Sequence, residues 1–232
     1  MKKRSLISFV LIALLLSTGG FAEEAKPSAP LKVLKGKDAP EITEVVKVLM
    51  VTDAGDLVIE VYPQAAPNAA KRFIELVEAG FYDGTPIFRV VKQPKPFMAQ
   101  FGINSDMPEW KDENFDDDPT LFQLTRGTLA FAKAGPNINS TQVFINYQQN
   151  NFLADPENNF TTFAQVVEGM EIADSWVSVG DPGMGLSQGK LWQNHHYVND
   201  LPMKPNMIEE MKIIVDEEPE AEKKESEESK AD

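Results

Sequence analysis

The sequence predicts a mainly β fold, a barrel or a sandwich, for residues 44–215 of the 232-residue chain. Short runs of apolar and β-branched residues recur along this stretch, and the connections between them are rich in Gly and Pro. Few segments show the i, i+3, i+4 spacing of apolar residues that indicates a helix. We therefore expect a capped barrel, in which two helices flank the strands.

The predicted strands begin with a β-hairpin. Its two runs, 45–52 and 57–62, enclose the turn residues Asp53-Ala54-Gly55-Asp56. The later strands are short apolar runs bounded by Gly, Pro or polar residues, and we place them at 86–91, 97–102, 127–132, 142–146, 162–167 and 207–215.

Two segments are predicted to be helical. The first spans 68–79, where Asn68 can cap the start and Phe73 belongs to the apolar face. Gly80 stands where a glycine commonly ends a helix. The second is a short helix over 170–177.

Both ends of the chain are expected to lie outside the domain. Residues 1–22 have a cationic start, an apolar run at 6–16 and small residues up to Ala22, which is the layout of a secretory signal peptide. The apolar run is short for a membrane span, although an uncleaved anchor is the alternative. We expect an exported protein, periplasmic or secreted, without stable membrane insertion after cleavage. Residues 23–43 are predicted to be a linker and 216–232 a disordered acidic tail.

Composition excludes several classes of function. The net charge of −14 opposes binding to nucleic acid. The chain has no Cys, which excludes disulfides, thiol oxidoreductase chemistry and thiolate metal sites. No cofactor is expected, and the protein is expected to be a monomer.

Other candidate sites have simpler interpretations. His195 and His196 are predicted to be solvated loop histidines rather than metal ligands. The glycines of 180–189 are predicted to form a flexible loop, because the Lys of a phosphate-binding loop is missing. Residues 116–118 are three consecutive Asp, predicted to be an exposed charge run rather than a calcium site. We therefore expect no metal site.

One constellation suits the binding of an extended peptide. Arg89 is a lone cation inside the apolar run 87–91, and the apolar strand 97–102 carries the amide of Gln100. Gln142 and Phe144 share one face of a later strand, because alternate residues of a strand point the same way. A cationic fork, two amides and soft apolar side chains suit a peptide better than a nucleotide or a metal.

These residues also resemble the cyclophilin-type peptidyl-prolyl isomerases. The matching motifs are F-R-V-V…F-M-x-Q and F-A-x-A-G-P-N-x-N-x-x-Q-x-F-I, with further matching segments at 112–115 and 167–170. The resemblance covers about residues 46–215. It implies an eight-stranded antiparallel closed barrel with a helix at each end, and a groove for proline-containing polypeptides on its outer face. With the predicted leader, it implies a bacterial exported form.

The resemblance also implies roles for individual residues. Arg89 matches the catalytic Arg. Gln100 and Gln142 match the groups that hold the substrate backbone and orient the Arg, while Ala132 and Lys133 match residues whose backbone contacts the peptide. The expected walls of the proline pocket are Phe97, Met98, Phe144, Phe152, Leu153 and Phe160.

Four departures from the family pattern affect these expectations. Phe88 replaces the usual His before the Arg, and the loop 92–96 replaces a short Pro-Gly link, which is expected to reshape the groove. Phe152 replaces a Trp, and the loss of an indole N–H donor implies weak cyclosporin binding. Phe160, after the lengthened loop 154–159, replaces the pocket His and is expected to slow turnover.

Two hypotheses about function follow. The first is a prolyl cis–trans isomerase that assists the folding of exported proteins, favoured by the intact Arg89, Gln100 and Gln142. The second is a binding module that holds proline-containing segments and isomerises them poorly, for which the loop 92–96 and Phe160 argue. A structural envelope protein is a third and weaker possibility.

Overall fold

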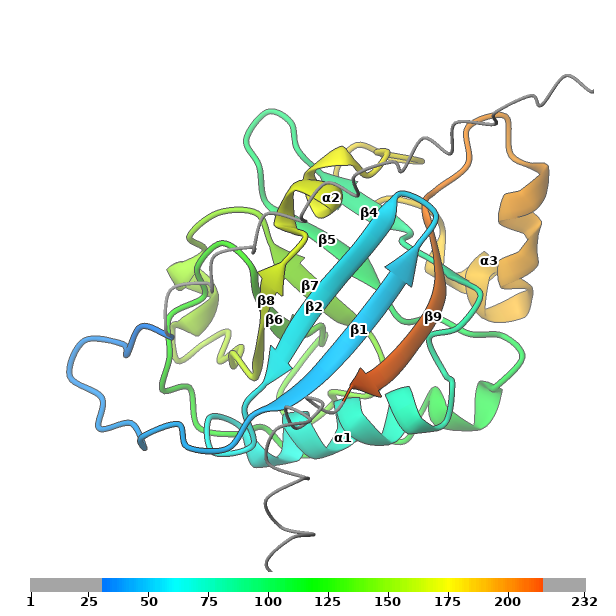
Figure 1. The fold of residues 1–232 in the computed structure, drawn as a ribbon. Helices are drawn as coiled ribbons and strands as arrows, with labels where there is room; N and C mark the ends of the chain where they lie inside the picture. Colours follow the sequence, from blue (N-terminus) through cyan, green and yellow to red (C-terminus); the bar gives the residue numbers. More distant parts are fainter. Residues whose placement is uncertain (1–30, 215–232) are drawn as a thin grey trace, which may run out of the picture.

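One curled sheet of nine antiparallel strands forms the frame of the molecule in the computed structural model, which describes residues 31–214 (Figure 1). The predicted signal peptide, the start of the predicted linker and the predicted acidic tail lie outside the described residues. The order of the strands in the sheet is β3-β9-β1-β2-β8-β6-β7-β5-β4. Their bounds are β1 Val46–Thr52, β2 Gly55–Val61, β3 Thr85–Pro86, β4 Arg89–Val91, β5 Met98–Phe101, β6 Thr128–Phe131, β7 Val143–Asn146, β8 Ala164–Glu168 and β9 Met207–Ile214.

The pairing of the strands corrects the expected eight-stranded closed barrel. β3 and β4 form the two ends of the sheet, and only Ile87 and Phe88 separate them in the chain. The backbone N–H of Ile87 donates to the carbonyl of Asn206 at 2.9 Å, whereas that of Phe88 donates to the carbonyl of Gln100 at 3.1 Å. The predicted strand 86–91 is therefore split, because its first part pairs with β9 and its second part with β5.

The predicted hairpin forms from β1 and β2. Its register runs from Val46 opposite Val61 to Thr52 opposite Gly55, at the turn. Burial alternates along β1, so that Val48 faces the core while its neighbours are more exposed. The alternation follows from the pleat of a strand, which turns successive side chains to opposite faces.

Three α-helices and three short 3-10 helices accompany the sheet in the described part. α1 covers one end of the curled sheet and α2 lies at the opposite end, as the sequence predicts (Figure 1). α3 lies at the side, in a segment for which no helix was expected. The bounds are α1 Pro67–Glu78, α2 Met170–Ser175 and α3 Gln188–Gln193, with 3-10 helices at Pro108–Trp110, Asn151–Ala154 and His195–Asp200.

The start of α1 is capped by a distant residue, not by Asn68 as expected. The N-cap position is Ala66, and no side chain of the helix itself caps it. Instead, the carboxylate of Asp118 accepts the backbone N–H groups of Asn68 at 3.1 Å and of Ala69 at 2.9 Å. Asp118 is only 4% exposed, so the predicted exposed charge run 116–118 is wrong for this residue. At the other end, Gly80 follows the last helical turn with φ +67°, as the sequence predicts.

Aromatic side chains fill the core between α1 and the sheet. Phe73 of α1 is fully buried, and its ring centroid lies 5.2 Å from that of Phe163. Phe131 of β6 lies 5.1 Å from the same ring. Tyr82 adds a further contact with Phe73 at 5.5 Å. Burying such rings removes a large apolar area from water, which stabilises the fold.

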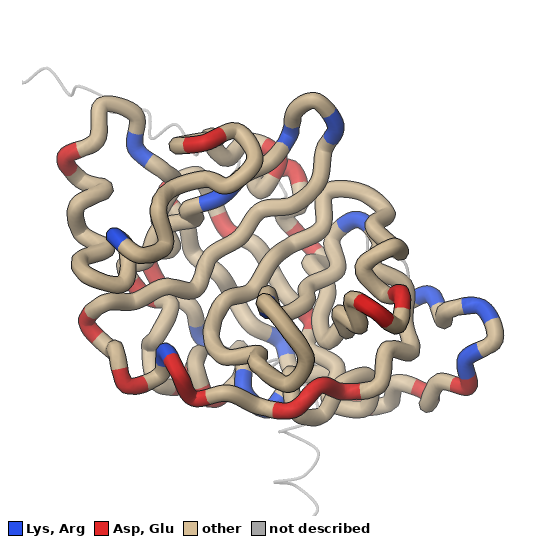
Figure 2. The backbone as a smooth tube through the Cα atoms, turned by 180° about the vertical axis from the view of Figure 1, so that it is seen from behind, with Lys and Arg blue, Asp and Glu red and all other residues tan. Residues whose placement is uncertain are grey.

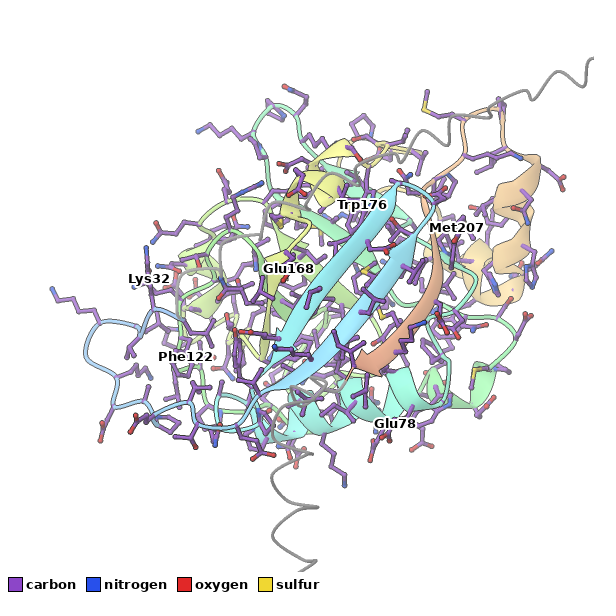
Figure 3. All side chains as sticks on the ribbon, viewed as in Figure 1. Lys32, Glu78, Phe122, Glu168, Trp176 and Met207 are labelled. Atoms are coloured by element: carbon purple, nitrogen blue, oxygen red, sulfur yellow. The ribbon has the colours of Figure 1, made fainter. Side chains whose placement is uncertain are left out.

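The described part of the predicted linker lies against the domain. The backbone N–H of Gln123 donates to the carbonyl of Lys32 at 2.8 Å, and Leu34 and Leu121 are bonded in the same way at 2.9 Å. Figure 3 shows Lys32 close to Phe122, the buried residue around which this segment packs. Residues 31–43 therefore add a small apolar cluster to the outside of the domain.

Replacing Asp118 with Ala removes the acceptor of two backbone N–H groups at the start of α1. We expect the free energy of unfolding to fall by about 1–3 kcal/mol, the cost of leaving buried donors unpaired. Urea denaturation measures this change. Asp116→Ala is the matched control, because the side chain of Asp116 is exposed, and its effect should stay below about 0.5 kcal/mol. Equal effects of the two substitutions would contradict the capping role.

Candidate functional site

A groove with a volume of about 510 Å³ lies on the side of β5 and β7 that faces away from the main core. Met98 and Gln100 of β5 line it, while Ala99 and Phe101 of the same strand face the core, as the alternation of a strand requires. A volume of this size suits a ligand larger than one side chain. The predicted site residues that line the groove are Arg89, Phe97, Met98, Gln100, Ala132, Lys133, Gln142, Phe144, Leu153 and Phe160.

Phe152 is the predicted site residue that the structure leaves outside the groove lining. It is 53% exposed, and its ring is stacked on that of Phe97 with the centroids 6.1 Å apart. Sequence reasoning in turn missed Gln188 and Trp192, which line the groove from α3. The one local signal for this helix is Ser187, whose Oγ accepts the N–H of Lys190 as an N-cap does.

The guanidinium of Arg89 is held by two oxygen atoms. Its Nε donates to the carbonyl of Gly183 at 2.8 Å, and its Nη1 donates to Oε1 of Gln100 at 3.0 Å. The ring of Phe97 lies 5.9 Å from the guanidinium carbon. Burial lowers the pKa of Arg89, because removal from water disfavours the charged form. The two hydrogen bonds orient the guanidinium plane and leave its other N–H donors for a ligand.

The carbonyl that holds Arg89 belongs to a tight turn. Oδ1 of Asp181 accepts the backbone N–H groups of Gly183 and Met184, each at 2.8 Å. Gly185 has φ +71°, and a Cβ there would lie 2.3 Å from the carbonyl oxygen of Phe88, so only glycine fits. The segment predicted as a flexible loop is therefore a hydrogen-bonded turn packed on the residue that precedes Arg89.

A line of amides leads away from Arg89. Nε2 of Gln100 donates to Oε1 of Gln142 at 2.9 Å, and Nε2 of Gln142 donates to Oε1 of Gln188 at 3.2 Å. Gln100 is 3% exposed, so its amide depends on these partners for its hydrogen bonds. The orientation of each amide follows from the first member, since a guanidinium can only donate.

An apolar pocket lies next to Arg89. Met98, Phe144 and Leu153 are buried there, and the rings of Phe144 and Phe160 meet edge to face with centroids 5.7 Å apart. Phe97 and Ala132 pack against the same cluster. The pocket could hold a small apolar ring of a ligand, because its lining is apolar and the oriented guanidinium of Arg89 lies next to it.

The side chain of Lys133 packs against Phe160, which forms one wall of this pocket. Its Nζ lies 2.6 Å from Oδ2 of Asp117 and donates to the carbonyl of Asn159 at 3.0 Å, and it lies 5.5 Å from the ring centroid of Phe160. Both partners of the ion pair are largely buried, which corrects the prediction that Asp117 is exposed. Burial alone would raise the pKa of Asp117, but the hydrogen bonds from Lys133 and Asn139 hold it below its usual range.

A backbone hydrogen bond closes the loop 92–96 directly before the groove residue Phe97. The backbone N–H of Phe97 donates to the carbonyl of Val91 at 2.9 Å, which closes the loop where β4 ends and β5 is about to begin. The Gln93–Pro94 peptide bond inside the loop is cis. Nζ of Lys92 donates to the carbonyl of Trp176 at 2.6 Å, so the loop is tied to the end of α2.

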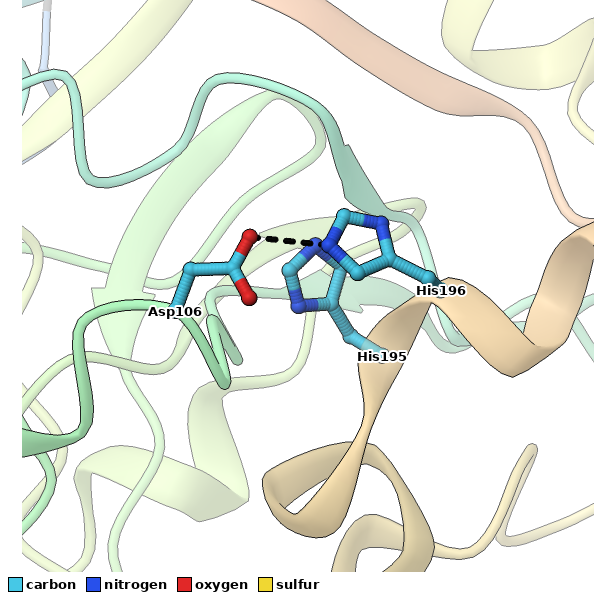
Figure 4. A group of neighbouring side chains, drawn as sticks. All are labelled: Asp106, His195 and His196. Carbon is cyan, nitrogen blue, oxygen red and sulfur yellow. Dashed lines mark hydrogen bonds and ion pairs between the residues drawn. The ribbon is translucent and has the colours of Figure 1, made fainter.

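His195 is buried, which corrects the prediction that it is solvated. The residue is 1% exposed, and its Nδ1 accepts the backbone N–H of Ser105 at 3.0 Å. His196 is exposed, and its Nε2 lies 2.8 Å from Oδ2 of Asp106 (Figure 4). These contacts attach the segment that follows α3 to the loop that follows β5.

Asp106, His195 and His196 have the residue types of a metal site and lie close together (Figure 4). A neutral imidazole has a single lone pair, and Nδ1 of His195 uses it to accept the N–H of Ser105. The ring therefore has no second lone pair for an ion. The contacts present are those of a tether between two segments.

Charged residues are dispersed over the described part of the chain. In Figure 2, Lys and Arg lie in several separate places and Asp and Glu lie mainly around the margin. The view shows no continuous basic stripe of the kind that binds nucleic acid.

The chain is similar to known proteins along most of its length. Residues 47–203 match the family model of the cyclophilin type peptidyl-prolyl cis-trans isomerases. Over 177 residues it is 35% identical to the peptidyl-prolyl cis-trans isomerase A of Dickeya dadantii (strain 3937), covering 72% of this chain and 84% of that protein. It is 31% identical to the peptidyl-prolyl cis-trans isomerase B of Escherichia coli (strain K12), covering 59% of this chain and 87% of that protein.

A solved structure shares the fold. A cyclophilin type peptidyl-prolyl cis-trans isomerase from Cryptosporidium parvum, crystallised in the presence of the dipeptide Ala-Pro, matches with a TM-score of 0.57. The match covers 73% of this chain and 99% of that one, at 23% identity. At this identity the likeness shows the fold alone.

The buried His195 should make the stability of the protein depend on pH. Burial, and to a smaller extent the neighbouring His196, lowers its pKa from the ordinary value of 6.5, while Asp106 opposes this. The unfolded chain thus binds the proton first as the pH falls. The contribution of His195 is complete above about pH 6.5 and is lost below it, with a slope of up to about 1.4 kcal/mol per pH unit.

Denaturation between pH 7.5 and pH 5 measures this effect. In the His195→Gln variant we expect a smaller loss of stability between these values than in the native protein. His196→Gln should keep most of the loss, because burial is the larger cause of the shift. An unchanged pH dependence in His195→Gln would refute the assignment.

Proposed function

Because the chain belongs to the cyclophilin-type peptidyl-prolyl cis–trans isomerase family, we propose that this isomerase accelerates the rotation of Xaa-Pro bonds in exported proteins, with Arg89 as its catalytic residue. One observation carries the assignment of Arg89. Its guanidinium is oriented by Gly183 and Gln100 beside the apolar cluster that contains Met98, and it keeps further N–H donors for the groove.

Rotation of an Xaa-Pro bond requires little catalytic apparatus besides such a donor. The peptide bond resists rotation by ~18–20 kcal/mol because of resonance, and an Xaa-Pro bond isomerises over tens of seconds or more. In the half-rotated state the prolyl nitrogen becomes pyramidal and regains a lone pair. A donor aimed at this nitrogen stabilises the twisted state more than the planar one, which lowers the barrier. Arg is suited to this because it stays charged and its donors form a rigid fork.

The remaining groove residues receive matching roles. The prolyl ring enters the apolar pocket formed by Met98, Phe144, Leu153 and Phe160, with Phe97 at its edge. The N–H of Ala132 already donates to the carbonyl of Gln142 at 2.8 Å, so Ala132 would contact the peptide through its carbonyl. The side chain of Lys133 is engaged in its ion pair, which agrees with a role for its backbone only.

The exported location rests on the sequence of residues 1–22. Their cationic start, apolar run and small residues support a cleaved secretory leader and a periplasmic or secreted protein of bacterial type. No helix among the described residues combines the length and apolar character needed to cross a bilayer. Polypeptides that fold after export are the substrates that such a location would provide.

The monomeric state and the weak binding of cyclosporin also stay predictions. Phe152 supports the second of these, because it is half exposed beside Phe97 and offers no N–H donor. The alternative function, a module that binds proline-containing segments and isomerises them poorly, keeps one observation in its favour. Phe160 gives the pocket a purely apolar wall where the family has a His.

Isomerisation of a short Ala-Xaa-Pro-Phe peptide by the domain tests the proposal. Arg89→Ala should lower kcat/KM at least ~10-fold, which corresponds to about 1.4 kcal/mol of the barrier. Arg89→Lys keeps the positive charge but loses the forked donors, so its kcat/KM should lie between those of the native protein and Arg89→Ala. Arg126→Ala is the matched control, because Arg126 forms an exposed ion pair with Asp174, and it should retain native activity.

Two outcomes would overturn the proposal. One is the absence of acceleration by the native protein, which would favour the binding module if the peptide still binds. The other is full activity of Arg89→Ala in a protein that is folded by circular dichroism.

A further inference from the structure

α3 is attached to the backbone beside Arg89. The N–H of Leu186, just before the helix, donates to the carbonyl of Phe88 at 2.9 Å. Leu191 of α3 is fully buried and packs in one cluster with Phe88, Ile103 and Val198. Phe88 thus connects α3 with Arg89, because its side chain packs against α3 and Arg89 is the next residue in the chain. The position of α3 relative to Arg89 is therefore set by packing.

The first residue of α3 faces the groove. Gln188 lines it together with Trp192, one turn further along the helix. Its Oε1 accepts the hydrogen bond from Nε2 of Gln142 at 3.2 Å. Gln188 is therefore the last acceptor in the line that begins at Arg89 and passes through Gln100 and Gln142.

The geometry points to Gln188 as a positioning residue of the isomerase site, which acts on Arg89 through Gln142 and Gln100. This inference rests on the proposed function of Arg89. Each amide in the line has one orientation that satisfies both neighbours, because a flipped amide would set two donors against each other. Gln188 provides the acceptor that completes the line.

Replacing Gln188 removes the last hydrogen bond of the line, the one that Gln142 donates. Nε2 of Gln142 then has no partner from α3, and its amide gains rotational freedom. Gln100, which is buried, loses its fixed acceptor, and the guanidinium of Arg89 is oriented less strictly. Misorientation of a catalytic donor reduces catalysis even when every catalytic group is present.

The experiment compares two glutamines on one short helix. Gln188→Ala should lower kcat/KM about 3- to 10-fold, as expected for one neutral hydrogen bond, mainly through kcat. Gln193→Ala makes the same chemical change at the exposed end of α3, outside the groove lining, and should leave kcat/KM within about twofold. Gln188→Glu keeps an acceptor for Gln142 and should restore most of the activity.

A double-mutant cycle tests the route of the effect. In a Gln142→Ala background, Gln188→Ala should cause no further loss, because the residue through which it acts is gone. The inference is overturned if Gln188→Ala matches Gln193→Ala, if Gln188→Glu is as slow as Gln188→Ala, or if the full loss persists in the Gln142→Ala background.

The arms also separate this inference from the proposed function. A large loss in Arg89→Ala together with no loss in Gln188→Ala refutes the role of Gln188 only. If Arg89→Ala itself retains activity, the proposed function fails. Melting temperatures of all variants identify any general loss of structure, and Gln188→Glu provides the test should Gln188→Ala prove poorly folded.

Discussion

A guanidinium that is partly removed from water needs oxygen atoms around it, and the fold brings them to Arg89 from distant parts of the chain. Gln100 comes from the neighbouring strand β5, whereas Gly183 comes from a turn more than ninety residues further along. Each bond replaces a contact with water and at the same time removes a degree of freedom from the side chain. The site therefore has a donor that is both charged and already oriented, which is the form of preorganisation that electrostatic catalysis requires.

The backbone directly before Arg89 is fixed at the break in the sheet, at Ile87 and Phe88. β3 pairs with β9 at one end of the curled sheet, and β4, two residues further along the chain, pairs with β5 at the other end. The residue before Arg89 therefore lies where the chain passes from one end of the sheet to the other. The turn with Gly185 and the apolar cluster under α3 both pack on Phe88. A shift of this backbone would move the guanidinium, and the surrounding contacts oppose such a shift.

Buried polar residues connect the parts of the molecule that the sheet does not join. Asp118 ties the loop that carries it to the start of α1, and its neighbour Asp117 pairs with Lys133 under the wall of the pocket. His195 attaches the segment after α3 to the loop after β5. Each of these groups is costly to bury without a partner, so each contact makes one arrangement of the loops much more favourable than the others.

Local patterns in the sequence were sufficient for most of the strands, for both predicted helices and for ten of the residues that line the groove. The alternation along β1 and β5 follows from the pleat, and the spacing around Phe73 follows from the helical turn, so neighbouring residues contain this information. The motifs around Arg89 and Gln142 likewise lie within short stretches. Most of the residues they indicate do line one groove in the structure.

The partners of polar residues were decided only by the tertiary structure. Nothing near Asp118 indicates that it caps a helix fifty residues earlier, and nothing near His195 indicates that its Nδ1 will accept the N–H of Ser105. Gln188 belongs to the groove because α3 packs on Phe88, a contact across about one hundred residues of chain. The sequence by itself determined which residues are apolar, which are charged and with what period they recur. A hydrogen bond or an ion pair depends on the distance between two groups in space, and for distant residues that distance exists only once the chain has folded.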